Sequence, residues 1–174
     1  TKSQGKRILE ENMKLLKVYE KFPITLIKGQ GSYVWDHTGE KYLDLYGGHG
    51  VVSIGHSHPS YIEAIVNQVN ELGFYSNKIE NLLQCELASQ LGKVSKYPDY
   101  NLFMCNSGAE AVENALKLAA WHTGKQHIVS CKGGFHGRTS LAIQVSDAKE
   151  YCSPVNGGAS VSFVDWNDTS ALNS

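Results

Sequence analysis

The chain has 174 residues, of which 41% are hydrophobic and 19% are charged, and its formal net charge at pH 7 is -1. This length is enough for one domain with a substantial core. The balanced charge lacks the basic excess of nucleic-acid-binding proteins, and no apolar run reaches the roughly 20 residues that span a membrane. We expect no secretory signal peptide, because the polar residues 1–7 have no apolar segment behind them, and the missing initiator Met indicates a trimmed start.

The four cysteines are Cys85, Cys105, Cys131 and Cys152, and no two of them form a CxxC pair. This spacing fits neither a zinc site nor the disulfide framework of a small secreted protein. Cys105 and Cys131 lie in apolar, strand-like runs, so we expect them to be buried thiols. A reducing, cytoplasmic location fits this cysteine pattern.

The N-terminal part of the chain predicts a short helix and a hairpin. Residues 8–20 have a helical pattern that breaks at Pro23. Farther on, Tyr33–Trp35 and Tyr42–Leu45 flank the turn sequence His37-Thr38-Gly39, and this arrangement predicts two antiparallel strands.

A Gly- and His-rich loop leads into a predicted helix that starts at Pro59 and stops at Gly73. One face of this helix carries the apolar side chains Ile62, Ile65, Val66, Val69 and Leu72. His56 and His58 lack a third metal ligand at a plausible spacing, so turn and helix-cap roles are favoured over a metal site. The sequence Gly29-Gln30-Gly31 does not predict a dinucleotide site, because no strand is predicted before it and the motif does not continue.

Helices and strands alternate in the rest of the chain. A third helix is predicted from Ile79 to Leu91, closed by Gly92, and a fourth helix follows Ser107. Strands are predicted at residues 101–105, 127–131 and 161–164. From residue 101 onward this alternation predicts an α/β fold with a mainly parallel sheet, in which ligands bind at the loops after the carboxyl ends of the strands.

The sequence Asn106-Ser107-Gly108-Ala109 stands between a predicted strand and a predicted helix. The free N–H groups and the dipole at a helix N-terminus favour a phosphate, which Gly108 would allow to approach and Ser107 would contact. An N-cap serine without a ligand is the simpler alternative. In the helix itself, Glu113 and Lys117 are expected to pair on the solvent side, and the apolar stripe comprises Val112, Ala115, Leu116 and Ala119.

The sequence Gly133-Gly134-Phe135-His136-Gly137-Arg138 follows another predicted strand. Two flat rings and a forked cation lie within this short glycine-rich loop. Arginine suits a bidentate bond to a carboxylate. Together with the phosphate site, this loop points to a flat, phosphorylated cofactor and an amino-acid-like substrate.

The chain resembles the N-terminal part of class III, fold type I, pyridoxal-phosphate-dependent aminotransferases. The motifs "NSGAEAVENALKLA" and "GGFHGRTSLA", in this order and spacing, carry the resemblance, and "KGQGSYVWDHTGEKYLD" and "GHSHP" extend it. Among these enzymes it is most similar to the N-acetylornithine and N-succinylornithine aminotransferases. The resemblance implies a mainly parallel sheet with flanking helices, preceded by a small N-terminal α+β segment.

Position by position, the resemblance implies that Ser107, Gly108 and Ala109 contact the cofactor phosphate. Many relatives have Thr in place of Ala109, so this chain would lack one hydroxyl contact. Phe135 would stack on the pyridine ring with His136 beside it.

The resemblance also implies substrate contacts. Arg138 would bind the α-carboxylate of the amino donor and of 2-oxoglutarate, and Tyr19 would lie at the substrate mouth. Tyr19 alone fits a surface or core role equally well. Gly48 and His49 match positions near the substrate, although His49 is not the usual residue there.

The family's catalytic lysine, which forms the Schiff base, and the aspartate below the pyridine nitrogen match no position before Ser174. The resemblance also implies that residues 1–58 belong to a small domain and that residues 59–174 begin a large cofactor-binding domain, which is incomplete in this chain. The complete enzyme is expected to be a homodimer, with no nucleic acid, membrane or metal as partner.

The favoured function is transfer of the terminal amino group of an N2-acylornithine to 2-oxoglutarate, as in arginine metabolism. A 4-aminobutyrate or ornithine aminotransferase is the alternative within the family. A non-catalytic ligand-binding fragment is the alternative from another class. A dinucleotide-binding oxidoreductase is disfavoured because the chain has no GxGxxG motif.

Overall fold

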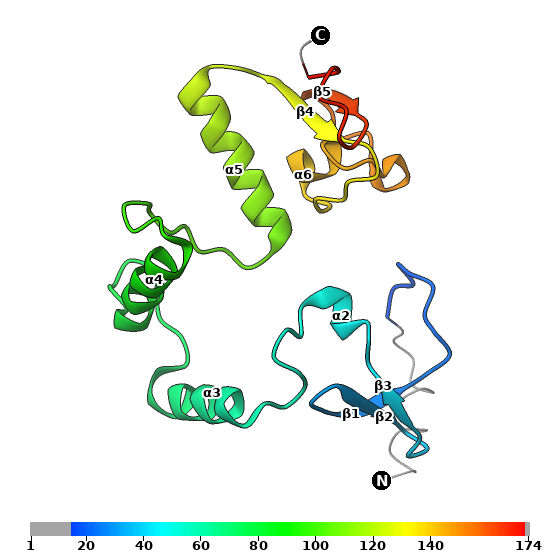
Figure 1. The fold of residues 1–174 in the computed structure, drawn as a ribbon, viewed down its shortest axis with the longest axis vertical. Coiled ribbons are helices and arrows are strands. Elements are labelled where there is room, and N and C mark those ends of the chain that lie inside the picture. The colour runs from blue at the N-terminus through cyan, green and yellow to red at the C-terminus, as the bar shows by residue number, and fades with distance from the viewer. Residues whose placement is uncertain (1–14, 173–174) are drawn as a thin grey trace. The chain divides into compact units, whose positions relative to one another are not determined.

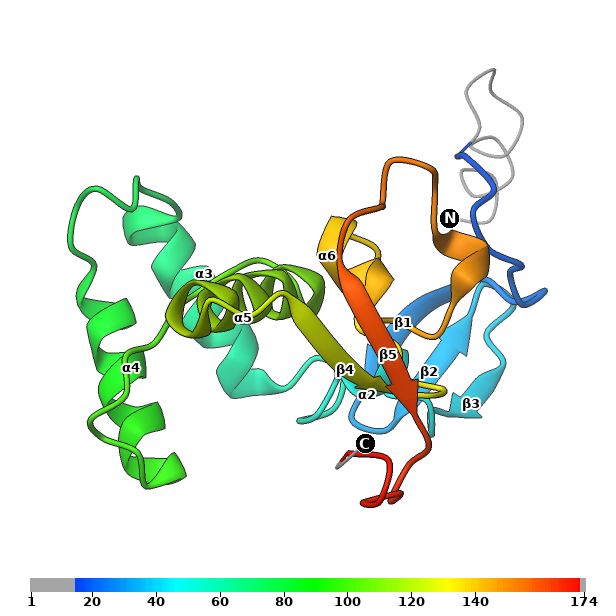
Figure 2. The same ribbon diagram turned by 90° about the horizontal axis from the view of Figure 1, so that it is seen from above.

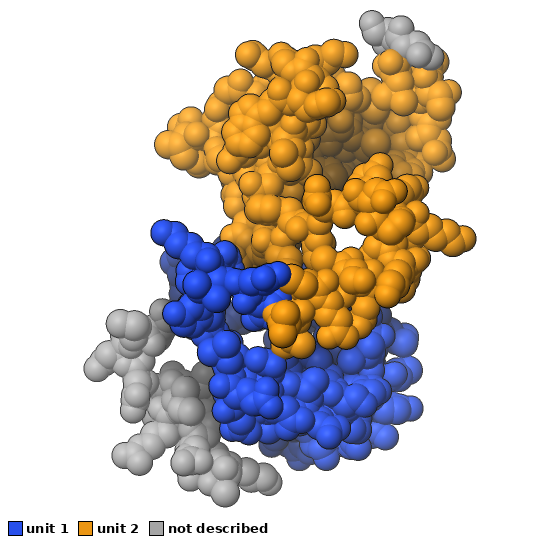
Figure 3. Space-filling view, turned by 90° about the vertical axis from the view of Figure 1, so that its left-hand side faces the viewer, with its two compact units in different colours: residues 1–81 blue, residues 82–174 orange. Residues whose placement is uncertain are grey.

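The computed structural model describes residues 15–172, and these fall into two units that divide between Asn81 and Leu82 (Figure 3). Each unit is described by itself. The predicted boundary between residues 58 and 59 concerns the domains of a complete enzyme, and it stays a prediction.

Three short strands in the first unit form an antiparallel sheet, β1 (Leu26–Gln30), β2 (Tyr33–Asp36) and β3 (Lys41–Leu43), in that order (Figure 1). The predicted hairpin of β2 and β3 is confirmed, with Val34 opposite Tyr42. Strand β1 escaped sequence analysis, because it includes two of the residues of the Gly29-Gln30-Gly31 motif. Its pairing with β2 needs the tight turn at Gly31, which has a φ of +56°.

The side chain of Asp36 organises the turn between β2 and β3. One carboxylate oxygen accepts hydrogen bonds from Thr38 N (2.8 Å), Thr38 Oγ1 (2.7 Å) and Glu40 N (3.0 Å). The other accepts a hydrogen bond from Tyr42 Oη at 3.2 Å. The bond from the Thr38 hydroxyl is the largest influence on the Asp36 pKa, and with the backbone bonds it outweighs the effect of burial and lowers that pKa to about 2.

The loop after β3 contains an unusual turn. All four residues of α2 (Gly47–Gly50) have positive φ, including 62° at His49, so this short element is a left-handed turn. Asp44 precedes it and accepts hydrogen bonds from Tyr46 N, Gly47 N and His56 Nε2. The predicted turn role of His56 is not confirmed: its backbone forms an isolated antiparallel bridge with Gly31, and its ring lies 2.7 Å from Asp44 Oδ2.

Two helices complete the described elements before residue 100. The helix predicted from Pro59 is confirmed as α3 (Pro59–Leu72), with His58 at its N-cap position and Gly73 at its C-cap. The third predicted helix is displaced, because α4 spans Leu82–Ser95 and includes Gly92 instead of stopping before it. It ends where Lys96 adopts a φ of +66°.

The sequence prediction was wrong for two other segments. Residues 15–20 form no helix, and residues 8–14 lie outside the described part of the chain. Residues 101–105 form no strand, because no strand in the described residues pairs with them. Cys105 is consequently exposed and Cys131 is half-buried, so the expectation of buried thiols was wrong for both.

The second unit contains the predicted α/β arrangement. Helix α5 (Gly108–Thr123) is followed by β4 (His127–Cys131), and β4 pairs in parallel with β5 (Ser160–Val164) (Figures 1 and 2). Between the strands, sequence analysis missed α6 (Ser140–Gln144) and the short helix η1 (Lys149–Tyr151). Helix α5 packs against α6.

Buried hydrophobic side chains are few among the described residues. Four of the five lie in and after α6, at Ala142, Ile143, Val145 and Ala148, and the fifth is Val34 in β2. The apolar stripe of α5 is only partly covered, with Val112 and Leu116 half-buried beside β4. The core of the second unit therefore lies directly behind the loop that follows β4.

Candidate functional site

Ser107 is the N-cap of α5. Its Oγ accepts a hydrogen bond from Glu110 N at 3.2 Å, and Glu110 Oε2 in turn accepts one from Asn106 N at 2.6 Å. The two side chains thus resemble a capping box that reaches one residue farther back than usual. This capping explains why Ser107 begins the helix, whether or not a ligand binds there.

The same helix end retains anion-binding donors. The N–H groups of Gly108 and Ala109 lie in the first turn, where the helix supplies no carbonyl acceptor for them. Space around Gly108 is open, because a Cβ placed there would have no atom of another residue within 4 Å. A phosphate could therefore approach the backbone of this turn.

Gly137 brings the second predicted site against the first. Its φ is +123°, and a Cβ added to it would overlap the Ala109 side chain. Only glycine lets the loop after β4 approach α5 this closely. The structure therefore places the Phe135–Arg138 loop beside the N-terminus of α5, as the sequence motifs predicted.

A buried serine holds this loop from behind. Ser146, only 3% exposed, accepts a hydrogen bond from His136 N at 2.9 Å. Its hydroxyl lies 2.8 Å from Ala142 O and 3.3 Å from Gly137 O. Ser130 Oγ donates to Val145 O at 2.6 Å and lies 3.5 Å from His136 Nε2. Sequence analysis missed both serines, because their roles depend on contacts between distant segments.

Glu113 joins α5 to the other end of the loop. Its carboxylate accepts hydrogen bonds from Thr139 Oγ1 (2.8 Å), Leu141 N (2.9 Å) and Ala142 N (3.0 Å). Burial would raise the pKa of Glu113, but these hydrogen bonds outweigh it and lower that pKa. The expectation of a simple solvent-side pair with Lys117 was therefore incomplete, because Glu113 mainly caps α6.

Two of the side chains predicted to meet ligands are exposed. Phe135 is 59% exposed, and Arg138 is also exposed. His136 is half-buried, in agreement with its backbone and ring contacts to Ser146 and Ser130. Hydrogen bonds thus hold the backbone of this loop, and the side chains of Phe135 and Arg138 are exposed.

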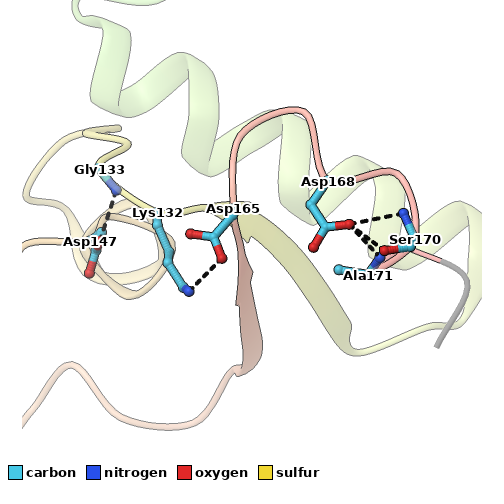
Figure 4. A network of polar contacts seen from close by, with 7 residues as sticks. All are labelled: Lys132, Gly133, Asp147, Asp165, Asp168, Ser170 and Ala171. Atoms are coloured by element: carbon cyan, nitrogen blue, oxygen red, sulfur yellow. Dashed lines mark hydrogen bonds and ion pairs between the residues drawn. The ribbon is translucent and has the colours of Figure 1, made fainter.

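Lys132, at the start of the loop, forms a 2.9 Å ion pair with Asp165 after β5 (Figure 4). The hydrogen bond and charge of Asp165 raise the pKa of Lys132. A catalytic amine needs the opposite shift, because only the neutral form is nucleophilic. The ion pair therefore joins the start of the loop to the end of β5, and Asp147 fixes the next residue by accepting a hydrogen bond from Gly133 N at 2.8 Å.

The other predicted contacts belong to the first unit. Tyr19 is half-exposed and lies in a segment without regular structure. Gly48 and His49 form the centre of the left-handed turn, and Tyr46 Oη lies within 2.7 Å of both ring nitrogens of His49. These observations leave the substrate roles of Tyr19, Gly48 and His49 as predictions.

In residues 15–172, no three His, Cys, Asp or Glu side chains are grouped so that they could hold a metal ion. No helix in the same range is long and apolar enough to cross a membrane.

The residues of the second unit fit a phosphorylated, planar cofactor. The open turn at Gly108, the donors of Gly108 and Ala109 and the exposed ring of Phe135 belong to segments that Gly137 holds together. Arg138 adds a positive charge suited to a substrate carboxylate. The backbone N–H groups, the aromatic ring and the guanidinium are thus suited to a phosphate, a planar ring and a carboxylate, respectively.

Comparison with known proteins agrees with this arrangement. The family model described as Aminotransferase class-III matches residues 16–173. The acetylornithine aminotransferase of Bacillus cereus is 45% identical over 161 residues, which cover 91% of this chain and 41% of that protein. The [LysW]-aminoadipate semialdehyde/glutamate semialdehyde transaminase of Sulfolobus acidocaldarius is 38% identical over 142 residues, which cover 82% of this chain and 37% of that protein.

Solved structures show the same fold. An ornithine aminotransferase from Toxoplasma gondii superposes with a TM-score of 0.80 and 25% identity, over 99% of this chain and 42% of that one. The taurine:2-oxoglutarate aminotransferase of Bifidobacterium kashiwanohense, solved with PLP and glutamate, gives a TM-score of 0.75 and 29% identity. This match covers 88% of this chain and 35% of that one.

These lengths show that the chain spans less than half of the relatives it matches. Its fold is the N-terminal portion of the fold type I, pyridoxal-phosphate-dependent transaminase fold, as the motifs predicted. With the family model matching nearly the whole sequence, the chain belongs to the class III aminotransferases.

Proposed function

We propose that this chain is the N-terminal part of a pyridoxal-phosphate-dependent aminotransferase that moves the terminal amino group of an N2-acylornithine to 2-oxoglutarate. The observation that carries the proposal is the Phe135–Arg138 loop held against the N-terminus of α5 by Gly137. Family membership and the acetylornithine aminotransferases among the relatives support the cofactor and the substrate class.

In this proposal the chain supplies binding and orientation. Ser107, Gly108 and Ala109 hold the cofactor phosphate with a hydroxyl and two N–H groups at the positive end of the α5 dipole. Phe135 covers the face of the cofactor ring, and His136 lies beside it. The chemistry supplied by the cofactor, when bound, is temporary storage of the amino group and withdrawal of electrons from the carbon that carries it.

Arg138 would bind a carboxylate of each substrate in turn. A guanidinium presents two parallel N–H donors to a carboxylate, and this bidentate contact fixes orientation as well as position. The amino donor and 2-oxoglutarate both carry a carboxylate, so one arginine can serve both half-reactions. Tyr19 is proposed to lie at the substrate entrance.

The proton-transferring lysine is proposed to lie in a part of the enzyme beyond Ser174. Neither of the two lysines in the described segments of the site, Lys132 and Lys117, suits this role. Lys132 is held in its ion pair with Asp165, and Lys117 lies over the Trp121 ring on the surface of α5. The complete enzyme is proposed to be a cytoplasmic homodimer, for which the lack of a CxxC pair among the four cysteines and the resemblance are the support.

The substitution Arg138→Ala in the complete gene product tests the assignment of substrates to this site. We expect KM for both the amino donor and 2-oxoglutarate to rise by about tenfold or more, because a charge-assisted hydrogen bond is worth about 1.5–3 kcal/mol. Arg138→Lys should restore part of the loss, since it keeps charge without the fork. Lys125→Ala, which removes an exposed cation beyond the C-terminus of α5, is the control, and equal kinetics for Arg138→Ala and Lys125→Ala would refute the assignment.

A mass measurement tests whether the working enzyme is longer than this chain. The complete gene product is incubated with pyridoxal phosphate, reduced with borohydride and weighed intact. We expect a mass well above 19.1 kDa with one cofactor attached. A 19.1 kDa product without an adduct would instead support the non-catalytic ligand-binding alternative.

A second candidate substrate follows from the relatives. Some of them are named as [LysW]-aminoadipate semialdehyde transaminases. Assays of the complete enzyme with acetylornithine, succinylornithine, free ornithine, 4-aminobutyrate and [LysW]-aminoadipate semialdehyde would separate these possibilities. The highest kcat/KM would identify the substrate.

A further inference from the structure

A carboxylate outside the predicted motifs connects the two halves of the candidate site. Glu113 lies one turn into α5, and its side chain reaches Thr139, the residue directly after Arg138. The same carboxylate accepts the N–H groups of Leu141 and Ala142. No side chain of α6 itself caps that helix, since its N-cap Thr139 makes no side-chain cap bond.

We propose that Glu113 is a positioning residue that fixes Arg138 relative to the phosphate-binding end of α5. This inference rests on the proposed function, because it concerns the same site. Glu113 itself touches neither the phosphate donors nor, in this proposal, the substrate. It acts by holding the backbone on the C-terminal side of Arg138.

The argument depends on two fixed points that flank Arg138. On the N-terminal side, Gly137 packs on Ala109 and His136 N bonds to the buried Ser146. On the C-terminal side, the Glu113 carboxylate holds residues 139–142. With both points in place, the Cα of Arg138 has one position relative to the first turn of α5. Without Glu113, the start of α6 loses this acceptor, while Ala142 stays buried and its carbonyl still accepts a hydrogen bond from Ser146 Oγ.

The energetic reason is the number of donors that Glu113 satisfies. One hydroxyl and two backbone N–H groups converge on it, and two of them would otherwise be unpaired at the start of a short helix. Charged acceptors make the stronger hydrogen bonds. Truncating Glu113 therefore releases the first turn of α6 and, with it, the C-terminal side of the Arg138 loop.

The chain offers a closely matched control. Asp168, in the turn after β5, accepts hydrogen bonds from the Ser170 hydroxyl, Ser170 N and Ala171 N (Figure 4). Its donor set of one hydroxyl and two N–H groups is the same as that of Glu113. Its hydrogen bonds reach residues of that turn and its charge acts on Lys132, so Asp168→Ala reports the cost of losing such a cap without releasing residues 139–142.

The test compares Glu113→Ala, Glu113→Gln and Asp168→Ala in the complete gene product. In Glu113→Ala we expect faster hydrogen exchange over residues 135–142 and a rise of about tenfold in KM for both carboxylate substrates, with a smaller change in kcat. Glu113→Gln keeps one acceptor oxygen and should lie between Glu113→Ala and the wild type. Asp168→Ala should leave KM and the exchange of residues 135–142 unchanged.

Binding of glutarate, a dicarboxylate that carries no amino or keto group to react, supplies a readout that does not need turnover. Calorimetry should show weaker binding to Glu113→Ala and wild-type affinity for Asp168→Ala. Unchanged exchange of residues 135–142, or unchanged KM and glutarate affinity, would overturn the positioning role. Failure of the proposed function is recognised separately: the wild-type gene product then shows no transaminase activity, while the effects on exchange and glutarate binding still decide the role of Glu113.

Discussion

At the scale of single residues, Ser107 shows that helix capping and anion binding are compatible. A serine hydroxyl has one O–H donor and two acceptor lone pairs. Ser107 uses an acceptor position for Glu110 N. Its O–H donates to no atom in the described residues, so a phosphate can accept this hydrogen without disturbing the cap.

The two roles of Ser107 can be separated by substitution. Ser107→Ala should lower the free energy of unfolding by about 1 kcal/mol and weaken pyridoxal phosphate binding, because it removes both the cap and the donor. Ser107→Asp should restore stability, since aspartate caps well, but should bind the cofactor more weakly still through charge repulsion. Thermal melting and cofactor titration of the complete enzyme measure both. Wild-type cofactor affinity in Ser107→Asp would exclude a phosphate contact.

Gly137 is predicted to be the residue least tolerant of substitution in the loop. Gly137→Ala adds a Cβ that overlaps Ala109 and imposes a side chain on a backbone with φ of +123°. We expect a loss of about 1–3 kcal/mol in stability together with weaker cofactor binding. The measurement is urea unfolding of the complete enzyme.

A double-mutant cycle separates the overlap from the backbone strain. Ala109→Gly removes the atom that the new Cβ would meet, so the double variant should recover part of the loss. Additive effects of the two substitutions would show that Gly137 and Ala109 are not in contact.

At the scale of elements, two glycines were predicted to end helices, and only one of them does so in the structure. Gly73 is the C-cap of α3, as predicted. Gly92 lies inside α4 instead, where a Cβ would come within 3.1 Å of Pro98 Cα. Its function is close approach of the following chain, and a single sequence does not distinguish this from a helix stop.

The β2–β3 turn should be sensitive to acid because of Asp36. The folded-state pKa of about 2 lies below the ordinary value of 3.8, so the charged carboxylate stabilises the fold. This contribution is complete above pH 3.8 and is lost as the pH falls toward 2. Asp36→Asn should therefore lower the melting temperature at pH 6 and make the protein less sensitive to acid.

The measurement is the melting temperature of the complete enzyme and of Asp36→Asn at pH 6 and pH 3. The control is Asp99→Asn, which changes an exposed aspartate after α4. If the two variants respond to acid identically, the hydrogen bonds of Asp36 do not stabilise the turn.

At the scale of the whole molecule, the described residues leave many large apolar side chains uncovered. The apolar face of α3, at Ile62, Ile65, Val66, Val69 and Leu72, is between 46% and 64% exposed. A soluble protein rarely exposes large contiguous apolar patches. This face of α3 is therefore a candidate surface for further packing contacts.

This exposure leads to a prediction about the isolated 174 residues. Expressed alone, they should enhance the fluorescence of the dye ANS roughly several-fold more per mole than the complete gene product, because ANS reports accessible apolar surface. Val69→Lys on the exposed face of α3 should reduce the signal of the isolated chain. Equal dye binding by the isolated chain and the complete product would contradict this account.

The local pattern of the sequence determined several of the helices and strands and the two motifs. The hairpin of β2 and β3, the helices α3 and α5 and the parallel strands β4 and β5 follow from periodicity, caps and turn residues, which act between near neighbours. The family follows from two motifs at a fixed spacing. Strand β1 and the missing strand at residues 101–105 did not follow, because strand formation depends on a partner from elsewhere in the chain.

Only the tertiary structure decided how the motifs form a site. It showed that Gly137 packs on Ala109, that the buried Ser146 holds His136, and that Glu113 caps α6 instead of merely facing solvent. Each of these contacts joins residues whose separation along the chain carries no periodic signal. Hydrogen-bond partners and close packing of this kind are set by three-dimensional proximity, and one amino-acid sequence read locally contains no measure of that proximity.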